Sequence, residues 1–215
     1  MAALLEIRNL HFAYTAAEPL LQGLNLQITA GDRLGIIGDN GCGKTTLLLL
    51  CAGVLSPQQG SIHCCGHPVV AGQFQPQLGV VLQNPADQLI GATVAEDVAF
   101  GPQNLGVPPA AVHRQVAEAL AATQTTHLAQ RVPHQLSGGE KRMVAIAGIL
   151  AMRPHVILYD EPTAFLDRRS CQALTAFLQQ NETPGMIISH DVPFLQSVCT
   201  QIMALEAGQL RPLAL

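Results

Sequence analysis

Nine consecutive residues of the chain have the types and spacing of a phosphate-binding loop. They fit the pattern G-x-x-x-x-G-K-[ST], and they are Gly38, Asp39, Asn40, Gly41, Cys42, Gly43, Lys44, Thr45 and Thr46. Glycines let a backbone fold around phosphates with its N–H groups pointing inward, and the N-terminus of a following helix adds about half a positive charge. We expect Lys44 to reach the terminal phosphates, Thr45 to ligate Mg²⁺ and Thr46 to contact a phosphate oxygen. The motif therefore predicts the binding of a nucleotide together with Mg²⁺.

Two carboxylates follow a buried apolar strand predicted over residues 156–159. Asp160 and Glu161 come where that strand ends, and ligands of α/β folds bind at the carboxyl ends of the strands. Phosphoryl transfer requires positioning and charge neutralisation more than covalent chemistry. We therefore expect Asp160 to hold Mg²⁺ through water, and Glu161 to position and polarise the attacking water. Alone, two such acids could equally cap a helix, so this prediction depends on the phosphate-binding loop.

A second run of hydroxyl and backbone N–H donors stands at the start of a predicted helix. It consists of Ser137, Gly138, Gly139 and Glu140. These residues would form a second phosphate-binding site in the same chain, but without a lysine of the first kind. One nucleotide cannot use both sites within one domain. We infer that the second site serves the nucleotide of a partner chain.

These motifs, in this order, resemble those of the ABC ATPase family over nearly the full length of the chain. The matching pieces are Tyr14, residues 38–46, Gln83, residues 136–140, residues 157–163, residues 165–167 and His190. The resemblance implies that Tyr14 stacks on adenine. It implies that Gln83 senses Mg²⁺ and couples the ATP site to a membrane partner, and that His190 contacts the γ-phosphate.

The same resemblance implies an enzyme that hydrolyses ATP while two copies hold it between them. Glu161, His190 and Lys44 would be its catalytic residues. Asp167 would lie at the dimer interface, where the neighbouring Phe165 is unusually bulky. Because all motifs are intact, both sites of a homodimer could hydrolyse ATP.

Residues 81–102 and 139–148 resemble the energy-coupling factor ATPases in particular, which drive uptake of vitamins and of nickel or cobalt ions. This implies a homodimer, or a heterodimer with a second ABC ATPase, bound to an integral membrane coupling subunit and a substrate-binding membrane subunit. Coupling helices in this family carry arginines, so Asp87, Glu96 and Asp97 are candidate acidic contacts. Each of these acids could instead cap a helix or lie on a solvated face.

Alternatives for the transported substrate and for the class of function stay open. We favour nickel or cobalt, because the chain ends soon after the strands predicted at residues 201–210, without the extra C-terminal region of many vitamin-type relatives. Biotin or another vitamin is the alternative substrate. A soluble ABC ATPase of DNA repair or translation is the alternative of a different class, although we see no coiled-coil insertion, tandem ATPase domain or basic surface.

Composition limits the classes of function further. The chain has 215 residues, of which 48% are hydrophobic and 12% charged, and its net charge is −4. No basic tail or stripe is visible, so we expect no nucleic-acid partner. We see no secretory signal, and no apolar run approaches the roughly 18 residues of a membrane span. We therefore expect a peripheral protein on the cytoplasmic face of the membrane, with its cysteines reduced.

The pattern of apolar residues predicts the elements that would position the motifs. Strands are expected at residues 3–8, 24–28, 32–37, 61–65, 78–82, 156–159, 186–189 and 201–210, and helices at 44–54, 94–100, 110–122, 140–152 and 168–180. The first strands alternate, which favours a half-exposed antiparallel sheet, whereas the later strands are apolar throughout and favour a parallel sheet covered by helices.

We therefore predict an α/β fold, a P-loop NTPase of the ABC ATPase type, over a single domain 1–215. It would combine a mixed, largely parallel core sheet with an N-terminal antiparallel β subdomain and a helical signature subdomain at about 84–152.

Two cysteine-containing features have weaker interpretations. His63, Cys64, Cys65 and His67 could suggest a metal site, but tetrahedral zinc spacing is absent and adjacent cysteines diverge, so we favour a small β-turn. Cys42 would lie at a helix N-terminus near Lys44, two features that activate a thiol, so we hypothesise a reactive thiol that ATP protects.

Overall fold

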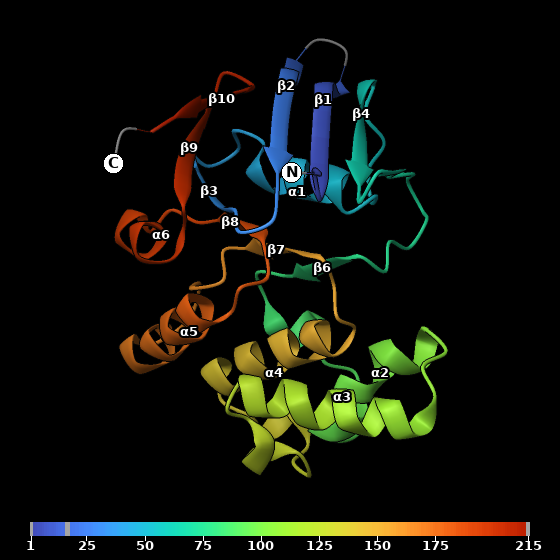
Figure 1. Ribbon diagram of the computed structural model, residues 1–215. Helices are drawn as coiled ribbons and strands as arrows, with labels where there is room; N and C mark the ends of the chain where they lie inside the picture. The colour runs from blue at the N-terminus through green and yellow to red at the C-terminus, as the bar shows by residue number, and fades with distance from the viewer. Residues whose placement is uncertain (1, 16–17, 214–215) are drawn as a thin grey trace.

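The computed structural model describes residues 2–15 and 18–213, which form two sheets with helices around them (Figure 1). The strands are β1 (Leu5–Thr15), β2 (Glu18–Ile28), β3 (Arg33–Ile37), β4 (Gln59–Cys64), β5 (His67–Pro68), β6 (Leu78–Val81), β7 (Val156–Asp160), β8 (Gly185–Ile188), β9 (Gln201–Glu206) and β10 (Gln209–Pro212). The α-helices are α1 (Lys44–Cys51), α2 (Val94–Asn104), α3 (Pro109–Ala122), α4 (Gly138–Ala151), α5 (Arg168–Gln180) and α6 (Val192–Val198). Short 3₁₀ helices cover Pro85–Asp87, Thr126–Leu128 and Pro133–Gln135.

The central sheet has the strand order β10-β9-β3-β8-β7-β6. Strands β9, β3, β8, β7 and β6 run parallel, and β10 pairs antiparallel with β9. Every residue of β7 and β8 is buried, because both faces of the sheet are covered. The predicted parallel core is therefore confirmed. Its order brings the carboxyl ends of β3, β8 and β7 side by side, which is where the motifs follow.

The other sheet is antiparallel, with the order β2-β1-β4-β5. Leu5 and Ile7 of β1, and Leu24, Leu26 and Ile28 of β2, are buried, while the residues between them are exposed or half-buried. Such alternation is the pattern of a sheet with one face against a core. The half-exposed antiparallel sheet predicted from the sequence is confirmed.

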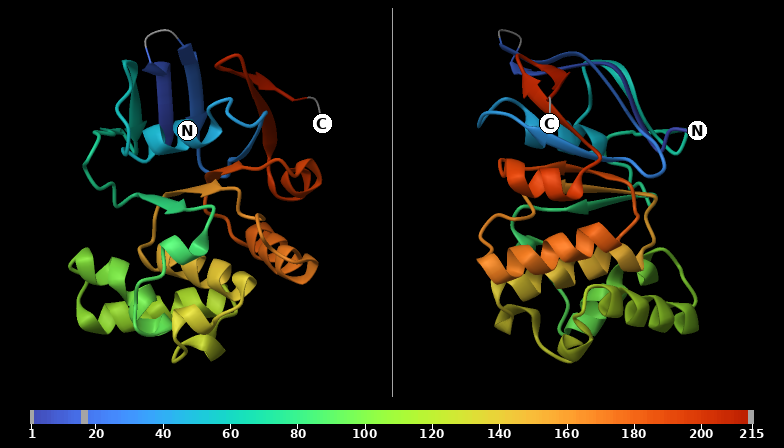
Figure 2. Two further views of the ribbon diagram at one scale, coloured as in Figure 1. Left: turned by 180° about the vertical axis from the view of Figure 1, so that it is seen from behind. Right: turned by 60° about the vertical axis from the view of Figure 1, so that its left-hand side comes forward.

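Helix α1 lies between the two sheets, whereas α5 and α6 cover the opposite face of the central sheet (Figure 1, Figure 2). Leu47 and Leu48 of α1 join one apolar core with Leu158 of β7. Ile157 of β7 points the other way, into a second core with Leu174 of α5. Because successive side chains of a strand point to opposite faces, one buried strand supports both cores.

Helices α2, α3 and α4 form a separate layer, on the side of the central sheet away from the antiparallel sheet (Figure 1). Val98 of α2, Leu120 of α3 and Val144 of α4 are buried together in a third core. This layer lies within the region predicted as helical from the sequence, residues 84–152.

The prediction that Gly101-Pro102 stops a helix at Phe100 is wrong. Helix α2 runs through Pro102 to Asn104, because a proline near a helix end removes only one backbone hydrogen bond. The helix ends at Asn104, two residues before Gly106, which has φ 71°. There the N–H of Gly106 donates to the Gln103 carbonyl at 2.9 Å and the N–H of Val107 donates to the Pro102 carbonyl at 3.1 Å. This pair of bonds is the Schellman arrangement that closes a helix C-terminus.

Smaller differences have local causes. Helix α1 ends at Cys51, short of the predicted Val54, because Gly53 adopts φ 70°. Helix α6 was not predicted from the sequence. The His63–His67 segment is a hairpin turn in which Cys65 and Gly66 both have positive φ, 49° and 80°. The small β-turn predicted from the sequence is therefore confirmed. Among residues 2–15 and 18–213, no three or more His, Cys, Asp or Glu side chains form a group that could hold a metal ion.

Within the same residues, none of the helices has the length and apolar character needed to cross a membrane.

Candidate functional site

The loop of residues 38–43 connects β3 to α1 and folds as the motif requires. Gly41 and Gly43 have φ 83° and 108°, which side chains other than glycine rarely adopt. Gly43 is the residue that precedes α1, and no side chain caps this helix N-terminus. The first N–H groups of α1 therefore remain free to bind an anion.

Backbone carbonyl groups of the loop hold the Lys44 side chain in place. Only 9% of the residue is exposed, and its Nζ donates to the carbonyls of Gly38 at 2.7 Å and Asp39 at 2.9 Å. An ammonium has three donors, so one remains for a phosphate oxygen. The geometry fits the role predicted for Lys44.

Thr45 and Asp160 bring the two halves of the predicted Mg²⁺ site together. The Thr45 hydroxyl lies 3.3 and 3.5 Å from the two carboxylate oxygens of Asp160. Asp160 is buried, and burial raises the pKa of its carboxyl group, an effect that the Thr45 hydrogen bond opposes. Oxygen ligands of this kind suit Mg²⁺, and a bound cation would offset the cost of the buried charge. The donor set fits the expected ion.

Glu161 and His190 lie next to each other at the ends of β7 and β8. The Glu161 carboxylate is 2.9 Å from His190 Nδ1, and the His190 side chain is 75% exposed. Glu161 has φ 43°, a conformation that few non-glycine residues adopt and that is often found at functional sites. Both side chains line the same cleft as the phosphate-binding loop.

A single cleft of about 700 Å³ collects most of the residues predicted to surround the nucleotide. Its lining comprises Tyr14, Leu20, Asn40, Gly41, Gly43, Lys44, Thr45, Thr46, Gln83, Glu161, Ile188 and His190. Tyr14 projects into water with 65% exposure, and its hydroxyl lies 3.2 Å from the Thr46 hydroxyl. An exposed ring beside the loop is suitably placed for a nucleotide base.

The second predicted phosphate site lies outside this cleft. Ser137 caps α4, because its hydroxyl accepts from the Glu140 N–H at 3.3 Å. The Glu140 carboxylate accepts in return from the Ser137 N–H and hydroxyl at 2.8 and 2.7 Å, and these bonds lower the pKa of Glu140. Glu140 therefore completes a capping box. Its predicted contact with the nucleotide stays a prediction.

Gly138 and Gly139, the first two residues of α4, complete this site. A Cβ on Gly139 would meet the Ser170 hydroxyl at 2.1 Å, so α5 requires a glycine there. Ser137, Gly139 and Glu140 line a different pocket of about 470 Å³, together with Asp167 and Ser170. The two predicted phosphate-binding surfaces therefore line separate pockets of the chain, and phosphate binding at each stays a prediction.

Two of the acids considered for partner contacts have different surroundings. Asp97 is buried, and its carboxylate accepts from the N–H groups of Ile90 at 2.7 Å and Gly91 at 2.6 Å. Asp97 is therefore a structural residue and the prediction that it meets a partner is wrong. Glu96 is exposed. Asp87 is also exposed, and it accepts from the Asn84 amide at 2.9 Å.

Arg142 is a site residue that the sequence did not single out. Its side chain is 0% exposed, and its guanidinium donates to the carbonyls of Leu82 and Gln83. Burial lowers the pKa of Arg142 to about 10, an effect partly opposed by the charge of Asp160. Arg142 thus ties α4, which carries the second phosphate surface, to the loop that carries Gln83.

The Arg142→Met variant should lose stability and activity together. Two partly buried carbonyls would lose their donor, and the packing of the fully buried Arg142 side chain would change, so we expect the free energy of unfolding to fall by about 3 kcal/mol. Because Arg142 would no longer hold the loop of Gln83 in place, the KM for Mg²⁺-ATP should also rise. Chemical denaturation and steady-state hydrolysis measure both effects. Arg114→Met, at an exposed arginine of α3, is the control and should change stability by less than about 0.5 kcal/mol. Equal losses in both variants would contradict the role given to Arg142.

Comparison with known proteins places these surfaces in a family context. The protein-family model described as ABC transporter matches residues 21–164. A putative ABC transporter ATP-binding protein of Synechocystis is 48% identical over 96% of this chain and 72% of its own length. The energy-coupling factor transporter ATP-binding protein EcfA of Methanothermobacter thermautotrophicus is 40% identical over 96% of this chain and 69% of its own length. The cobalt import ATP-binding protein CbiO of Syntrophus aciditrophicus is 41% identical over 87% and 69%.

Two solved structures are similar to this chain in fold. CbiO1 of Clostridium perfringens, described as part of the ABC transporter complex CbiONQ, superposes with a TM-score of 0.89 at 31% identity, over 98% of this chain and 88% of the other. The dimeric ATP-binding cassette MJ0796, bound to ADP and phosphate, superposes with a TM-score of 0.81 over 96% of each chain, and at 24% identity it supports the fold alone. The predicted fold class is confirmed.

Proposed function

Because the chain belongs to the ABC transporter family and is an ATP-hydrolysing protein of that family, we propose that it powers an energy-coupling factor type importer as one half of an ATP-bridged dimer. The observation that carries the proposal is the separation of the two phosphate-binding surfaces. The first combines the loop of residues 38–46 with Glu161, and the second consists of Ser137 and the two glycines that begin α4. Only a second chain can bring such surfaces onto one nucleotide.

The polar residues in and beside the cleft have distinct roles in this proposal. Lys44 and the N-terminus of α1 hold the phosphates, and Tyr14 stacks on adenine. Thr45, Asp160 and Gln83 hold Mg²⁺, which would neutralise charge on the transferring phosphate. Glu161 orients the attacking water, and His190, bound to Glu161 at 2.9 Å, contacts the γ-phosphate.

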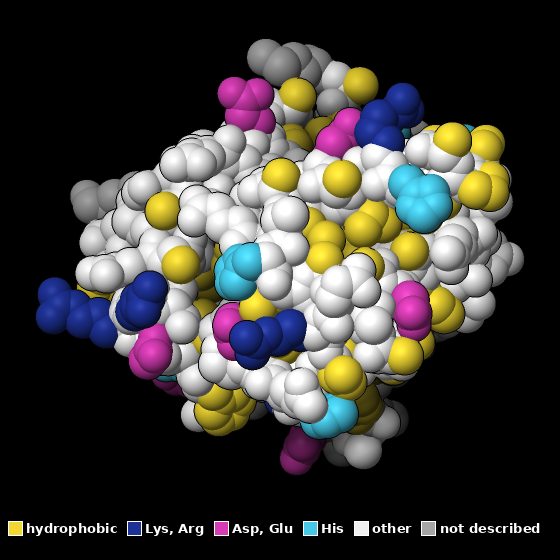
Figure 3. Space-filling view, turned by 90° about the horizontal axis from the view of Figure 1, so that it is seen from below, with side chains coloured by type: hydrophobic (Ala, Val, Ile, Leu, Met, Phe, Trp, Pro, Cys, Tyr) yellow, Lys and Arg dark blue, Asp and Glu magenta, His cyan; other side chains and the backbone are white. Residues whose placement is uncertain are grey.

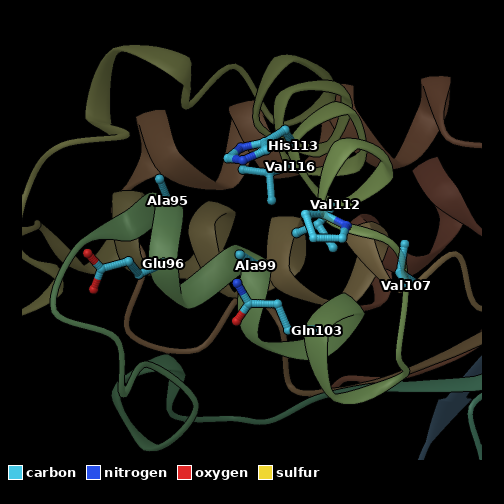
Figure 4. A pocket seen from close by; sticks show the side chains of 9 residues that line it. Ala95, Glu96, Ala99, Gln103, Val107, Val112, His113 and Val116 are labelled. Atoms are coloured by element: carbon cyan, nitrogen blue, oxygen red, sulfur yellow. The ribbon is translucent and has the colours of Figure 1, made fainter.

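A groove between α2 and α3 is the proposed contact for the integral membrane subunit. Its volume is about 350 Å³. Ala95 and Ala99 of α2 face Val112 and Val116 of α3 across it, and Glu96 stands at one end (Figure 4). Seen from below, the surface has apolar side chains near its centre, with charged side chains of both signs around them (Figure 3). An apolar floor with an acid at its rim suits a short helix that carries an arginine.

The Glu96→Arg variant should weaken assembly with the membrane subunits without changing hydrolysis by the isolated chain. The new arginine would repel the arginine that we expect on the partner's coupling helix. The amount of membrane subunit that co-purifies should therefore fall about tenfold or more. Quantitative co-purification from membranes measures this, and Glu182→Arg, at an exposed glutamate in the loop before β8, is the matched control. An unchanged yield with Glu96→Arg would remove Glu96 from the interface.

For the substrate we propose a divalent transition-metal ion, cobalt or nickel. The support is that relatives of this chain are named as a cobalt import protein and as part of CbiONQ. Others are named only for the energy-coupling factor, so biotin or another vitamin is the second candidate. Peripheral binding at the cytoplasmic face of the membrane follows from the proposed partners.

The test is co-purification of the membrane subunits with this chain, followed by uptake of labelled cobalt, nickel and biotin into vesicles that contain the complex. ATP-dependent uptake of a metal ion supports the proposal. Uptake of biotin alone would replace the substrate and keep the motor. Absence of any membrane partner would favour a soluble ABC ATPase of DNA repair or translation instead.

A further inference from the structure

Strand β6 ends the central sheet, and within the described chain no strand pairs with its outer edge. The side chain of Gln88 occupies part of that edge. Its carboxamide oxygen accepts from the N–H of Leu82 at 2.7 Å, and its nitrogen donates to the carbonyl of Val80 at 2.8 Å. In a parallel ladder, one residue of the next strand bonds to the same two groups, a carbonyl and the N–H two residues later. Gln88 therefore pairs with β6 as a neighbouring strand would.

A second side chain holds the same loop from the helical layer. The guanidinium of Arg142, on α4, donates to the carbonyls of Leu82 and Gln83. Both polar backbone groups of Leu82 are thus bound by side chains, the N–H by Gln88 and the carbonyl by Arg142. Gln83 follows directly, is exposed and lines the nucleotide cleft. Because β6 ends at Val81, the position of Gln83 depends on the two side chains that hold Leu82.

A compact turn brings Gln88 back to β6. The Asn84 amide donates to the Asp87 carboxylate at 2.9 Å, and the N–H of Gln88 donates to the Pro85 carbonyl at 3.2 Å. Gln88 itself is half-buried and does not line the nucleotide cleft. Any effect of its side chain on a bound nucleotide must therefore pass through the loop of Gln83.

We propose that Gln88 is a positioning residue for ATP hydrolysis, whose carboxamide holds the Leu82 peptide so that Gln83 stands at the Mg²⁺ site. The inference rests on the proposed function, because the contact of Gln83 with Mg²⁺ is part of that proposal. Removal of a group that orients a metal-binding side chain typically lowers metal affinity or activity about 10–100-fold. Gln88 would supply this support without touching the metal or the nucleotide.

The Gln88→Met variant keeps the length of the side chain and removes both bonds to β6. In the chain without nucleotide or Mg²⁺, hydrogen exchange at the Leu82 N–H should become about tenfold faster or more, because that N–H loses its acceptor. Mass spectrometry of peptides that contain Leu82 measures the exchange. This readout tests whether Gln88 holds the loop before any ligand is bound.

The same variant should change the Mg²⁺ dependence of hydrolysis more than its maximal rate. The Mg²⁺ concentration that gives half the maximal rate should rise about tenfold or more, because Gln83 is no longer held at the metal. At saturating Mg²⁺ the rate should stay near that of the parent. The Gln83→Ala variant should show a similar shift, and the double variant should shift no further, because both residues act through one contact.

Two further variants serve as controls. Gln179→Met removes another bond from a glutamine side chain to a backbone carbonyl, that of Ser197 at 3.1 Å, and should leave both readouts unchanged. Gln88→Glu can still accept from the Leu82 N–H but cannot donate to the Val80 carbonyl, so it should show smaller shifts in the same direction. It decides the question if Gln88→Met does not fold.

Each failure has a distinct meaning. Parent-like Mg²⁺ dependence in Gln88→Met, or shifts that multiply in the double variant, would overturn the inference and leave the proposed function intact. Parent-like Mg²⁺ dependence in Gln83→Ala would overturn the role of Gln83 in the proposed function, and the inference with it.

Discussion

The Glu161→Gln variant is expected to bind ATP normally and to lose turnover by about 10²–10⁴-fold. Glutamine keeps the size and hydrogen-bonding reach of the side chain, so the contact with His190 at 2.9 Å can persist. It lacks the negative charge that polarises the attacking water. Binding depends instead on the phosphate-binding loop and Lys44, which the substitution leaves untouched. Equilibrium titration with ATP and single-turnover phosphate release measure the two properties separately.

Glu182→Gln is the matched control for this prediction. It makes the same chemical change at an exposed glutamate outside the nucleotide cleft, and it should hydrolyse ATP at the parent rate. Near-normal hydrolysis by Glu161→Gln would remove Glu161 from its catalytic role. Loss of ATP binding would show that the substitution disturbs the cleft itself.

The Ser137→Asp variant is expected to lose at least about 10²-fold in hydrolysis while each monomer still binds ATP. Aspartate can accept from the Glu140 N–H as serine does, but it cannot donate to the Glu140 carboxylate, which lies 2.7 Å from the Ser137 hydroxyl. Thermal unfolding of the monomer is therefore measured beside hydrolysis, to show that α4 still folds. Its negative charge would face the γ-phosphate of the partner's nucleotide and keep the dimer from closing. Because Ser137 lies outside the cleft of its own chain, binding of ATP to the monomer should not change.

A charge placed at another helix cap controls for this substitution. Thr93 caps α2 in the same way, by accepting from the Glu96 N–H at 3.2 Å. Thr93→Asp should therefore leave hydrolysis near the parent rate. If Ser137→Asp weakened ATP binding by the monomer, the second surface would belong to the same nucleotide as the first. A fully active Ser137→Asp chain would show that the surface has no part in hydrolysis.

The sequence predicted those parts of the fold that depend on local patterns. Helix α5 begins and ends at the predicted residues, 168 and 180, because its apolar positions repeat with the helical period and Asp167 caps its first turn. The run of apolar residues in β7 likewise marks a strand buried on both faces. The phosphate-binding loop was recognised because its glycines and Lys44 have chemical roles that few other residues can fill.

The remaining features depend on contacts distant in sequence. From the sequence, an arginine on a helix is expected at the surface. Arg142 is buried because the loop of Leu82 and Gln83 lies against it. Asp97 looks like an exposed acid at a helix start, but the backbone of Ile90 and Gly91 turns back to bind it. Helix α2 continues through a proline because a glycine four residues later provides the better end. No local pattern contains these pairings.

The proposed function requires two chains around each nucleotide, and sedimentation of the Glu161→Gln chain tests this most directly. With Mg²⁺-ATP it should sediment as a dimer that retains two ATP molecules, and without nucleotide as a monomer. The same chain with Ser137→Asp added should remain monomeric with ATP bound. If the parent chain hydrolysed ATP at full rate as a strict monomer, with Ser137 dispensable, two chains would not share each nucleotide.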